Sequence, residues 1–261
     1  MNEATARKVN IIGTGISDIS IRETVSTFNA WIDKGTKKRV CITPVNCLLW
    51  ARENKKLREI YNSADLTLCD GVPLLWAAGF LKDHLKGRVT GLDLLPLYIE
   101  ECYRRNYSMF FLGAKEGIAE ALKDKYEAVY PGIQIKGFYS PPFADKFSDA
   151  ENSKICSLIN RANPDILWVS LTAPKQDYWI FDNFHNLNTH IAIGVGGAFE
   201  VSLGTIKRAP AFMQRNGLEW LYRFSQEPRR LFRRYLVEAP RFIPLVIKQR
   251  LQKNNNKTRP V

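Results

Sequence analysis

Short, almost continuously apolar runs alternate with longer amphipathic stretches as far as about residue 206, and this alternation limits the available folds more than any other feature of the chain. The runs are rich in β-branched and aromatic residues, which favour strands. We expect strands at Val9–Gly13, Val40–Thr43, Leu66–Leu68, Met109–Leu112, Ile133–Lys136, Ile166–Ser170 and Ile191–Gly194. Helical spacing predicts helices over about Arg22–Lys34, Asn46–Ser63, Leu92–Asn106, Glu116–Tyr130, Ser148–Arg161 and Lys175–Asn186. Apolar strands separated by helices indicate an α/β fold with a parallel sheet covered on both faces.

Positive charge is concentrated in the C-terminal part of the chain. From Lys207 onwards there are 14 Lys and Arg but only three acidic residues, whereas the rest of the chain is almost neutral and the net charge is +12. The strand–helix alternation also stops near Lys207. We therefore expect a folded core over residues 1–206 and a basic helical appendage over residues 207–261, suited to an anionic surface.

One stretch of this appendage has the pattern of an amphipathic helix. At about 100° per residue, four arginines form one arc and four apolar residues the opposite arc, namely Arg229, Arg230, Arg233 and Arg234 against Leu231, Phe232, Tyr235 and Leu236. A surface helix packed on the core would show the same division. The arginine density and Trp220 favour an anionic membrane surface over nucleic acid, because no recognised nucleic-acid-binding motif accompanies the charge.

Cysteine usage and apolar segment lengths indicate the compartment. The five cysteines are scattered and form no Cys-x-x-Cys pair, as is typical of a reduced, cytosolic protein that uses them as small core residues. No segment approaches the roughly 18 to 20 apolar residues needed to span a bilayer. The N-terminus lacks the apolar core of a signal peptide. We expect a protein that is neither secreted nor integral to the membrane.

Polar or glycine-rich turns follow most of the predicted strands. Because the carboxyl ends of parallel strands meet at one edge of a sheet, where such sheets bind ligands, these turns together describe a site. They are Thr43-Pro-Val-Asn46, Cys69-Asp70-Gly71, Gly113-Ala-Lys115-Glu-Gly117, Ala173-Pro-Lys175-Gln176 and Gly194-Val-Gly196-Gly197. Each turn also has a plainer interpretation as a helix cap or a simple strand-to-helix connection.

Three of these turns, and a segment near residue 88, suggest specific chemistry. Asp70 either caps the helix that follows or takes a proton from an acceptor hydroxyl. Thr43 and Asn46 either cap a helix or present a hydroxyl and an amide to a ligand, and Arg88 is suited to clamp a phosphate. The turn that contains Lys115 combines glycines with a helix N-terminus, which favours a phosphate or pyrophosphate.

Several other chemistries lack their residues. Gly13-x-Gly15 lacks the third glycine of a dinucleotide fingerprint and is better explained as a turn between strands. No Asp-x-Asp and no Gly-x-Ser-x-Gly is present, and the three histidines have no ligand-like spacing. We therefore expect a metal-independent reaction, with no metal site and no cofactor.

Motifs distributed over nearly the whole chain carry a resemblance. In order, they are Thr-Pro-Val-Asn, Asp-Gly-Val-Pro, Arg-Val-Thr-Gly-Leu-Asp, Phe-Leu-Gly-Ala-Lys, Ala-Pro-Lys-Gln-Asp, Gly-Val-Gly-Gly-Ala-Phe, Lys-Arg-Ala-Pro and Gly-Leu-Glu-Trp-Leu-Tyr-Arg-Phe-Ser-Gln-Glu-Pro-Arg-Arg. Together they resemble the WecG/TagA/CpsF glycosyltransferases. The runs Gly-Leu-Glu-Trp-Leu-Tyr-Arg and Ala-Pro-Lys-Gln are the most specific.

The resemblance implies a Rossmann-like core with an appendage that docks on the membrane and helps to complete the active site. It also implies an inverting, metal-independent hexosyltransferase that acts in cell-surface polysaccharide synthesis. The donor would be a UDP-sugar, such as UDP-N-acetylmannosamine, its uronic acid or UDP-glucose, and the acceptor a polyprenyl-diphosphate-linked sugar. Such an enzyme would be cytoplasmic and peripheral on the inner face of the cytoplasmic membrane. Self-association stays open.

Matching motifs carry roles over to individual residues. Asp70 would be the general base, with Thr43, Asn46, Arg88 and Gln176 beside it, and the appendage arginines that meet the acceptor diphosphate would be Arg223, Arg230 and Arg233. We expect the donor diphosphate to rest on the glycine-rich turns, at Gly113, Lys115, Gly117, Lys175, Gly196 and Gly197.

Departures from the family pattern lie in the same turns. Ser170-Leu-Thr172 replaces a glycine-rich strand end, Asp177 stands where glutamate is common, and Cys47-Leu-Leu replaces a common Ala/Pro-Glu pair. The identity of the sugar is therefore left open. Two other hypotheses remain, a nucleotide-cofactor oxidoreductase on a similar sheet and a non-catalytic basic protein that binds a membrane surface or nucleic acid. The first lacks the dinucleotide fingerprint, and the second leaves the polar turns unexplained.

Overall fold

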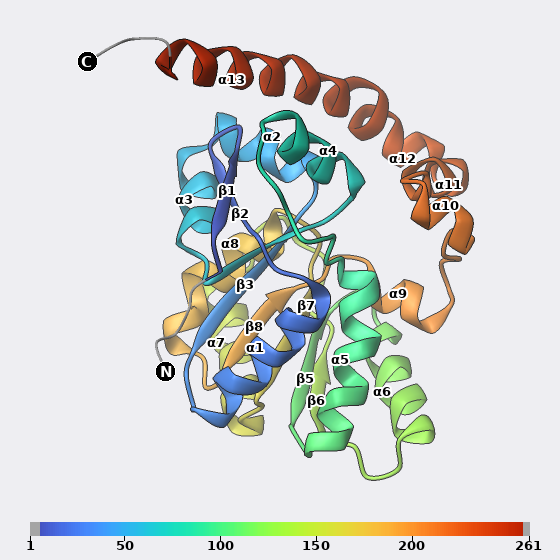
Figure 1. Cartoon of the computed structure of the whole chain (residues 1–261). Coiled ribbons are helices and arrows are strands. Elements are labelled where there is room, and N and C mark those ends of the chain that lie inside the picture. The colour runs from blue at the N-terminus through green and yellow to red at the C-terminus, as the bar shows by residue number, and fades with distance from the viewer. Residues whose placement is uncertain (1–5, 258–261) are drawn as a thin grey trace.

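A six-stranded parallel sheet forms the centre of the protein, as the computed structural model shows (Figure 1). The structure describes residues 6–257, apart from the side chains of Arg230, Asn256 and Lys257. The strand order is β4-β3-β8-β7-β5-β6. The strands are β3 (Lys38–Thr43), β4 (Leu66–Cys69), β5 (Met109–Gly113), β6 (Ile135–Tyr139), β7 (Ile166–Ser170) and β8 (Ile191–Gly194). The predicted α/β class, with helices around a parallel sheet, is confirmed.

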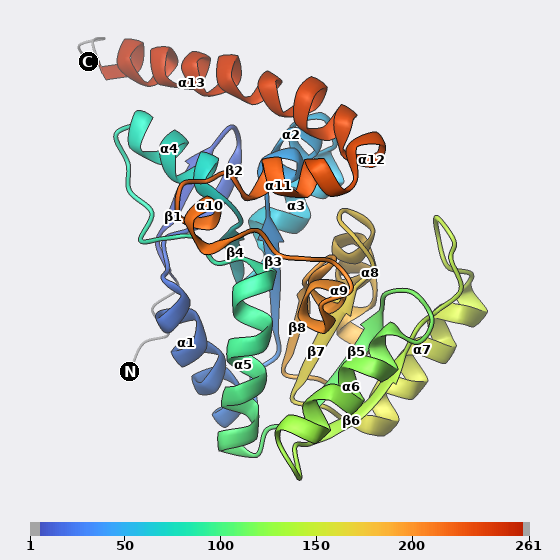
Figure 2. The ribbon, with the colours of Figure 1, turned by 90° about the vertical axis from the view of Figure 1, so that its right-hand side faces the viewer.

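Helices cover both faces of this sheet (Figure 2). One face carries α1 (Ile21–Asp33), α5 (Gly91–Arg105), α6 (Ile118–Val129) and α9 (Ala198–Leu203). The other carries α2 (Val45–Glu53), α3 (Lys55–Ser63), α7 (Asp149–Ala162) and α8 (Lys175–Asn183), which runs into a short 3₁₀ turn, η1 (Phe184–Asn186). Phe111 and Trp168 face the first layer, whereas Phe110 and Leu167 face the second. This alternation along each strand explains why the strands are apolar throughout.

The first predicted strand does not join the parallel sheet, so that expectation was wrong. Instead β1 (Lys8–Ile11) pairs antiparallel with β2 (Thr14–Ser17) in a separate hairpin, and Gly13 lies in the turn between them. Exposed and buried residues alternate along β1, as expected for a strand with one solvent-facing side. The interpretation of Gly13-x-Gly15 as a turn between strands is confirmed.

The long helix expected over residues 46–63 is interrupted at Asn54. Its backbone is extended, with φ −122° and ψ 112°, and its side-chain oxygen accepts a hydrogen bond from the backbone N–H of Leu57 at 3.0 Å. Asn54 therefore ends α2 and caps α3. Asparagine competes with helical backbone hydrogen bonds in this way because its short side chain reaches the neighbouring backbone.

The C-terminal part of the chain is helical and returns across the molecule. It contains α10 (Ala211–Arg215), α11 (Glu219–Gln226), α12 (Pro228–Phe232), a π-helical turn η2 (Arg233–Glu238), a 3₁₀ turn η3 (Ala239–Arg241) and α13 (Phe242–Lys257). Phe242 and Val246 pack on the β1–β2 hairpin and on α4 (Val72–Phe80), while Gln249 Oε1 accepts a hydrogen bond from Ile12 N at 2.8 Å. Figure 1 shows α13 lying over the hairpin and α4.

The π-helical turn changes the expected arrangement of the amphipathic stretch. Leu231 is buried, but Phe232 and Leu236 are about half exposed, so the predicted apolar arc does not pack as a unit. A π-turn adds a residue per hydrogen-bonded loop and so rotates later side chains away from their α-helical positions.

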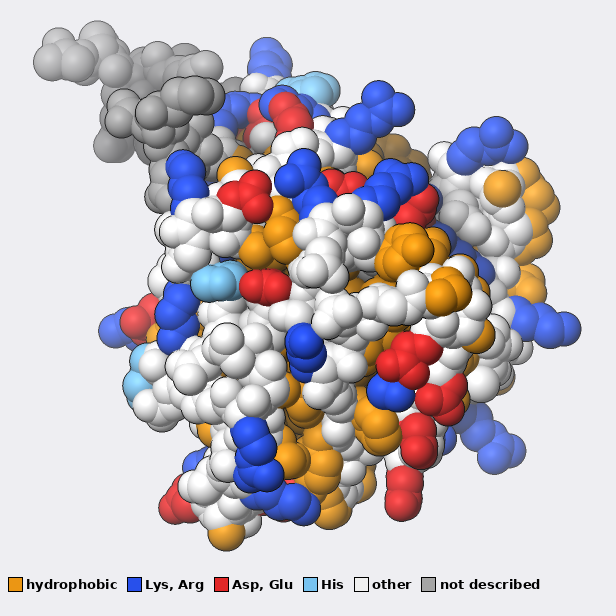
Figure 3. Space-filling view, turned by 90° about the horizontal axis from the view of Figure 1, so that it is seen from below, with side chains coloured by type: hydrophobic (Ala, Val, Ile, Leu, Met, Phe, Trp, Pro, Cys, Tyr) orange, Lys and Arg blue, Asp and Glu red, His pale blue; other side chains and the backbone are white. Residues whose placement is uncertain are grey.

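Within residues 6–257, no helix has both the length and the apolar character required to cross a membrane. The end of the molecule opposite α13 presents acidic and basic side chains interspersed with each other (Figure 3).

Asn54→Ala removes the cap of α3 and is expected to lower the free energy of unfolding by about 1 kcal/mol, because the N–H of Leu57 loses its partner. Urea unfolding measures the change. Lys55→Ala, at the next and likewise exposed position, is the control and should leave the midpoint almost unchanged. Equal midpoints for both variants would contradict the capping role.

Candidate active site

The predicted base lies where two neighbouring strands end. Thr43 closes β3 and Asp70 follows β4, and the backbone N–H of Asp70 donates to the carbonyl of Thr43 at 3.3 Å. The hydroxyl of Thr43, which is fully buried, donates to the carbonyl of Leu68 at 3.0 Å and so joins the two strand ends. Gly71 then takes a φ of +115°, which favours glycine, and α4 begins at Val72.

The surroundings of Asp70 alter its acidity. Burial is the largest influence and raises the pKa of the carboxyl to about 6. Arg234 and Arg88 lower this pKa, whereas Glu219 and Asp93 raise it. Glu219 and Arg234 belong to the C-terminal helices, so both the core and the C-terminal segment determine the charge at this position. A carboxyl with a pKa near 6 accepts a proton more readily than an ordinary aspartate.

Four alternating charges join the core to α11 beside Asp70. Arg88 Nη1 lies 3.3 Å from Glu219 Oε2, and Arg88 Nη2 lies 3.9 Å from Asp93 Oδ2. Arg208 bridges the same two carboxylates, at 3.2 Å to Glu219 Oε1 and 2.5 Å to Asp93 Oδ1. Thr90 caps α5 through Asp93 N and bonds the Asp93 carboxylate at 2.9 Å, which fixes that side of the cluster. Arg88 is therefore paired within the protein, at one side of the same site.

Gln176 lies buried at the end of β8. Its Oε1 accepts a hydrogen bond from Gly196 N at 3.0 Å. A Cβ at Gly194 would lie 2.6 Å from Gln176 Nε2, so the glycine is required for the amide to lie there. Arg223 reaches the same turn from α11, because its Nη2 lies 3.2 Å from the position of a Cβ on Gly197. The structure thus brings together two predicted turns, those of Gln176 and of Gly196, and one predicted appendage arginine, Arg223.

Unsatisfied polar atoms accompany this group. Asn46 is 4% exposed, and its Nδ2 has no hydrogen-bond partner among the described residues. The same holds for Arg234 Nε and for Glu200 Oε2, which lies 3.8 Å from the position of a Cβ on Gly197. Buried polar atoms are rarely left unpaired, so these atoms have hydrogen-bonding capacity available for a ligand.

The other predicted donor-binding residues lie on the far half of the sheet. Gly113 ends β5, and Ser140 Oγ donates to its carbonyl at 3.0 Å, while Lys115 and Gly117 are exposed in the turn that follows. The ammonium of Lys175 donates to the carbonyl of Ala144 and lies 3.8 Å from the centre of the Phe147 ring, towards the loop after β6. The strands that contain or precede these residues, β5 and β7, lie four and three positions from β4 in the sheet, and the role of these residues in donor binding stays a prediction.

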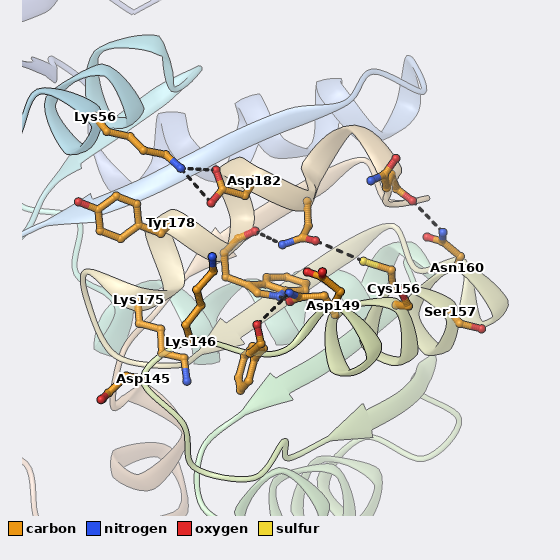
Figure 4. Close-up of a pocket in the computed structure, with 16 residues that line it drawn as sticks. Lys56, Asp145, Lys146, Asp149, Cys156, Ser157, Asn160, Lys175, Tyr178 and Asp182 are labelled. Carbon is orange, nitrogen blue, oxygen red and sulfur yellow. Dashed lines mark hydrogen bonds and ion pairs between the residues drawn. The ribbon is translucent and has the colours of Figure 1, made fainter.

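A pocket of about 900 Å³ lies between α7, α8 and this loop (Figure 4). Lys175 is the only predicted site residue that lines it. Side chains along its walls already bond one another, as Lys56 does with Asp182 at 2.7 Å and the Trp179 indole with Asn152 at 2.9 Å. The chemistry at the ends of β3, β4 and β8 is therefore separate from this pocket.

The appendage arginines differ in position. Arg223 reaches the site, but Arg233 is 85% exposed and pairs with Glu238 at 3.1 Å, and the side chain of Arg230 lies outside what the structure describes. Arg234 is instead the arginine of η2 whose charge acts on Asp70. Sequence reasoning placed Arg234 on the basic arc but gave it no role. The direction of the Arg234 side chain depends on the π-helical turn, and the spacing of apolar and basic residues in the sequence does not predict such a turn.

Asp177 is a second buried carboxyl close to the site. It is 1% exposed and accepts a hydrogen bond from the Tyr61 hydroxyl at 3.1 Å, while its other oxygen is unpaired among the described residues. Burial raises the pKa of Asp177 to about 7, and the hydrogen bond from Tyr61 lowers it in part.

Cys41 and Cys47 are buried nearby, and four of the five free cysteines are buried, as expected for small core residues. Within residues 6–257, no cluster of three His, Cys, Asp or Glu side chains is arranged to hold a metal ion.

Parallel sheets of this kind bind ligands at the carboxyl ends of their strands, where these polar turns lie. The sequence profile of the glycosyl transferase WecG/TagA/CpsF family matches residues 9–256. The chain belongs to this family and is a glycosyltransferase, as the resemblance implied.

Individual relatives carry a more specific name. A protein of Bacillus spizizenii is 28% identical over 198 residues, which cover 76% of this chain and 74% of that protein. One of Staphylococcus aureus is 25% identical over 243 residues, or 92% of each. Both are named N-acetylglucosaminyldiphosphoundecaprenol N-acetyl-beta-D-mannosaminyltransferase, which is a hexosyltransferase activity.

Asp177→Asn tests the buried carboxyl. Because the folded pKa of about 7 lies above the ordinary 3.8, burial favours the protonated form, and the wild type loses stability as pH rises from about 4 to 7. An amide does not titrate, so the free energy of unfolding of the variant should rise relative to that of the wild type by on the order of a few kcal/mol over that range. Urea unfolding at several pH values measures this. A stability difference that is constant with pH would contradict the raised pKa.

Proposed function

We propose that this enzyme transfers a hexose or N-acetylhexosamine from a UDP-sugar to a polyprenyl-diphosphate-linked sugar, with inversion and without a metal ion. The observation that carries the proposal is Asp70, whose carboxyl lies at the carboxyl edge of the sheet with its pKa raised to about 6 by burial. The names of the relatives support an acceptor of the N-acetylglucosaminyl-diphosphoundecaprenol class and a donor of the N-acetylmannosamine type, with UDP-glucose as the second donor to test.

In this proposal the carboxylate of Asp70 acts as the general base. The acceptor hydroxyl gives its proton to Asp70 as its oxygen forms a bond to the anomeric carbon of the donor. The bond between that carbon and the UDP oxygen breaks on the opposite face, which inverts the configuration. UDP leaves with the electron pair, and Asp70 later releases its proton to solvent. Asn46, with its unpaired Nδ2, lies at the strand ends and would orient the sugar, while Thr43, whose hydroxyl bonds the Leu68 carbonyl, would hold the two strand ends beside the base.

Positive groups of the protein would stabilise the diphosphates in place of a metal. Arg88, Arg223 and Arg234 converge on the site from the core and the C-terminal helices, and we assign the acceptor diphosphate to them together with Arg230 and Arg233. Gln176 would orient the donor beside the Gly196–Gly197 turn. The turn with Gly113, Lys115 and Gly117, together with Lys175, would hold the UDP diphosphate if the donor extends along the sheet edge.

The basic C-terminal segment fits a lipid-linked acceptor. In this proposal residues 1–206 carry the catalytic fold, and residues 207–261 attach the enzyme to the anionic inner face of the cytoplasmic membrane. The excess of Lys and Arg in this segment supports the assignment, since each basic residue near an anionic bilayer contributes about 1 kcal/mol. The product would serve cell-surface polysaccharide synthesis.

Asp70→Asn is expected to lower kcat by about 10²- to 10⁴-fold, because an amide cannot take the proton of the acceptor. The assay follows UDP release and product mass with a short-chain prenyl-diphosphate N-acetylglucosamine acceptor and a panel of UDP-sugars. Asp124→Asn, on the exposed surface of α6, is the matched control and should leave the rate unchanged.

The same assay tests the alternatives. Turnover by Asp70→Asn at the wild-type rate would contradict the role of the base, and loss of activity in EDTA would contradict metal independence. Vesicle binding by the wild type without transfer from any donor would favour the non-catalytic membrane protein. Tight binding of a nicotinamide dinucleotide would favour the oxidoreductase.

A further inference from the structure

Helix α4 starts beside the catalytic carboxyl and presents two large apolar side chains to solvent. It begins at Val72, two residues after Asp70. Trp76 is 64% and Phe80 50% exposed, and their spacing of four places them on one face of the helix. The other face is buried, since Leu74, Ala77 and Ala78 pack in one cluster with the β1–β2 hairpin and α13.

The exposed face of α4 continues into the C-terminal helices. Val72, one turn before Trp76, lies 3.1 Å from the position of a Cβ on Gly217, in the connection between α10 and α11 (Figure 2). Phe212 on α10 and Leu218 beside Gly217 are exposed as well. The core helix and the appendage therefore both expose apolar side chains near the point where they meet.

The other end of α4 meets α13. Lys253 Nζ donates to the carbonyl of Leu81 at 3.2 Å, and the exposed Lys82 follows. Along α13 a stripe of apolar residues spaced by four faces solvent, separate from the stripe of Phe242 and Val246 that packs on α4. The stripe consists of Ile243, Ile247 and Leu251, which are 62%, 44% and 58% exposed.

This combination of side chains suits the interface of an anionic bilayer. Tryptophan and phenylalanine partition to the headgroup region, and flanking lysines and arginines are attracted by anionic lipid. Residues 1–206 are almost neutral overall, whereas the C-terminal segment beside α4 carries the excess of Lys and Arg. Charge complementarity therefore selects an anionic lipid surface as the occupant of the exposed face.

We propose that α4, a helix of the catalytic core, inserts Trp76 and Phe80 into the bilayer interface and forms a second membrane anchor beside the basic C-terminal segment. The inference rests on the proposed function, because it extends the membrane attachment to the core itself.

Its consequence is positional. At 1.5 Å per helical residue, Trp76 lies about 6 Å along the axis from Val72, so Asp70 is held within about 15 Å of the inserted side chain. This brings the base to the height of a sugar that a diphosphate joins to a membrane lipid.

The test compares the double variant Trp76→Glu/Phe80→Glu with the wild type in co-sedimentation with phosphatidylglycerol-containing vesicles. We expect binding to weaken at least about tenfold, because two inserted apolar side chains are replaced by anions. The matched control is Leu97→Glu/Val129→Glu, which adds the same charge at side chains 40% and 55% exposed on α5 and α6 and should bind like the wild type. Turnover of a short-chain, water-soluble acceptor should stay within about twofold of the wild type in both variants.

Trp76→Phe gives a second readout that does not disturb the fold. The tryptophan emission of the wild type should shift to the blue on addition of anionic vesicles, and Trp76→Phe should shift clearly less, while the shift that remains belongs to Trp220 in the basic segment. Wild-type vesicle binding that survives in the double variant would overturn the inference and leave the proposed transfer untouched. A change from oligomer to monomer in sedimentation velocity, with vesicle binding unchanged, would assign the surface to a second copy and also overturn it. Loss of vesicle binding in an enzyme that transfers no sugar would support the anchor and contradict the proposed function.

Discussion

The ion cluster of Arg88, Asp93, Arg208 and Glu219 holds the C-terminal helices against the end of the sheet, and the site depends on it. Each charge faces two of opposite sign at 2.5 to 3.9 Å, and each side chain is about three-quarters covered. Partly covered pairs of this kind contribute modestly when intact, but removal of one member leaves its partners uncompensated. The cluster therefore fixes the position of the first turn of α11 against the core, through Glu219.

The position of α11 determines the electrostatics of Asp70. From α11 the chain continues through α12 into the π-helical turn, which directs Arg234 towards the site while Arg233 points to solvent. Arg223 on α11 lies over the Gly196–Gly197 turn. The carboxyl is thus shielded from water, which raises its pKa, and faces cations that limit the rise. The balance keeps it a usable base near neutral pH.

The sequence predicted the parallel sheet well because its strands are buried on both faces and therefore apolar throughout, as in β7 and β8. It predicted the turn at Asp70 for the same reason, since a polar residue and a glycine after such a run end the strand. It failed for β1, whose four residues leave the choice of partner strand to tertiary contacts. The break at Asn54 was missed because the apolar spacing continues on both sides of it.

Contacts between residues that are far apart in the sequence could not be predicted from it. Glu219 lies 131 residues from Arg88, and no spacing rule connects two such positions. Arg234 could be placed on a basic arc, but its direction follows from a π-turn that shifts the helical register. The family motifs assigned roles to Arg223, Arg230 and Arg233 but not to Arg234. The effect of Arg234 on Asp70 is therefore evident only from the structure.

The pKa of Asp70 tests the central claim most directly, namely that the C-terminal segment completes the site by acting on this carboxyl. It can be followed through the ¹³C shift of the side-chain carboxyl in aspartate-labelled enzyme, with Asp70→Asn to assign the signal. We expect a value of about 6 in the wild type, a higher value in Arg234→Gln, and no change in Arg233→Gln. A wild-type value near 3.8, or the same value with and without Arg234, would contradict the account.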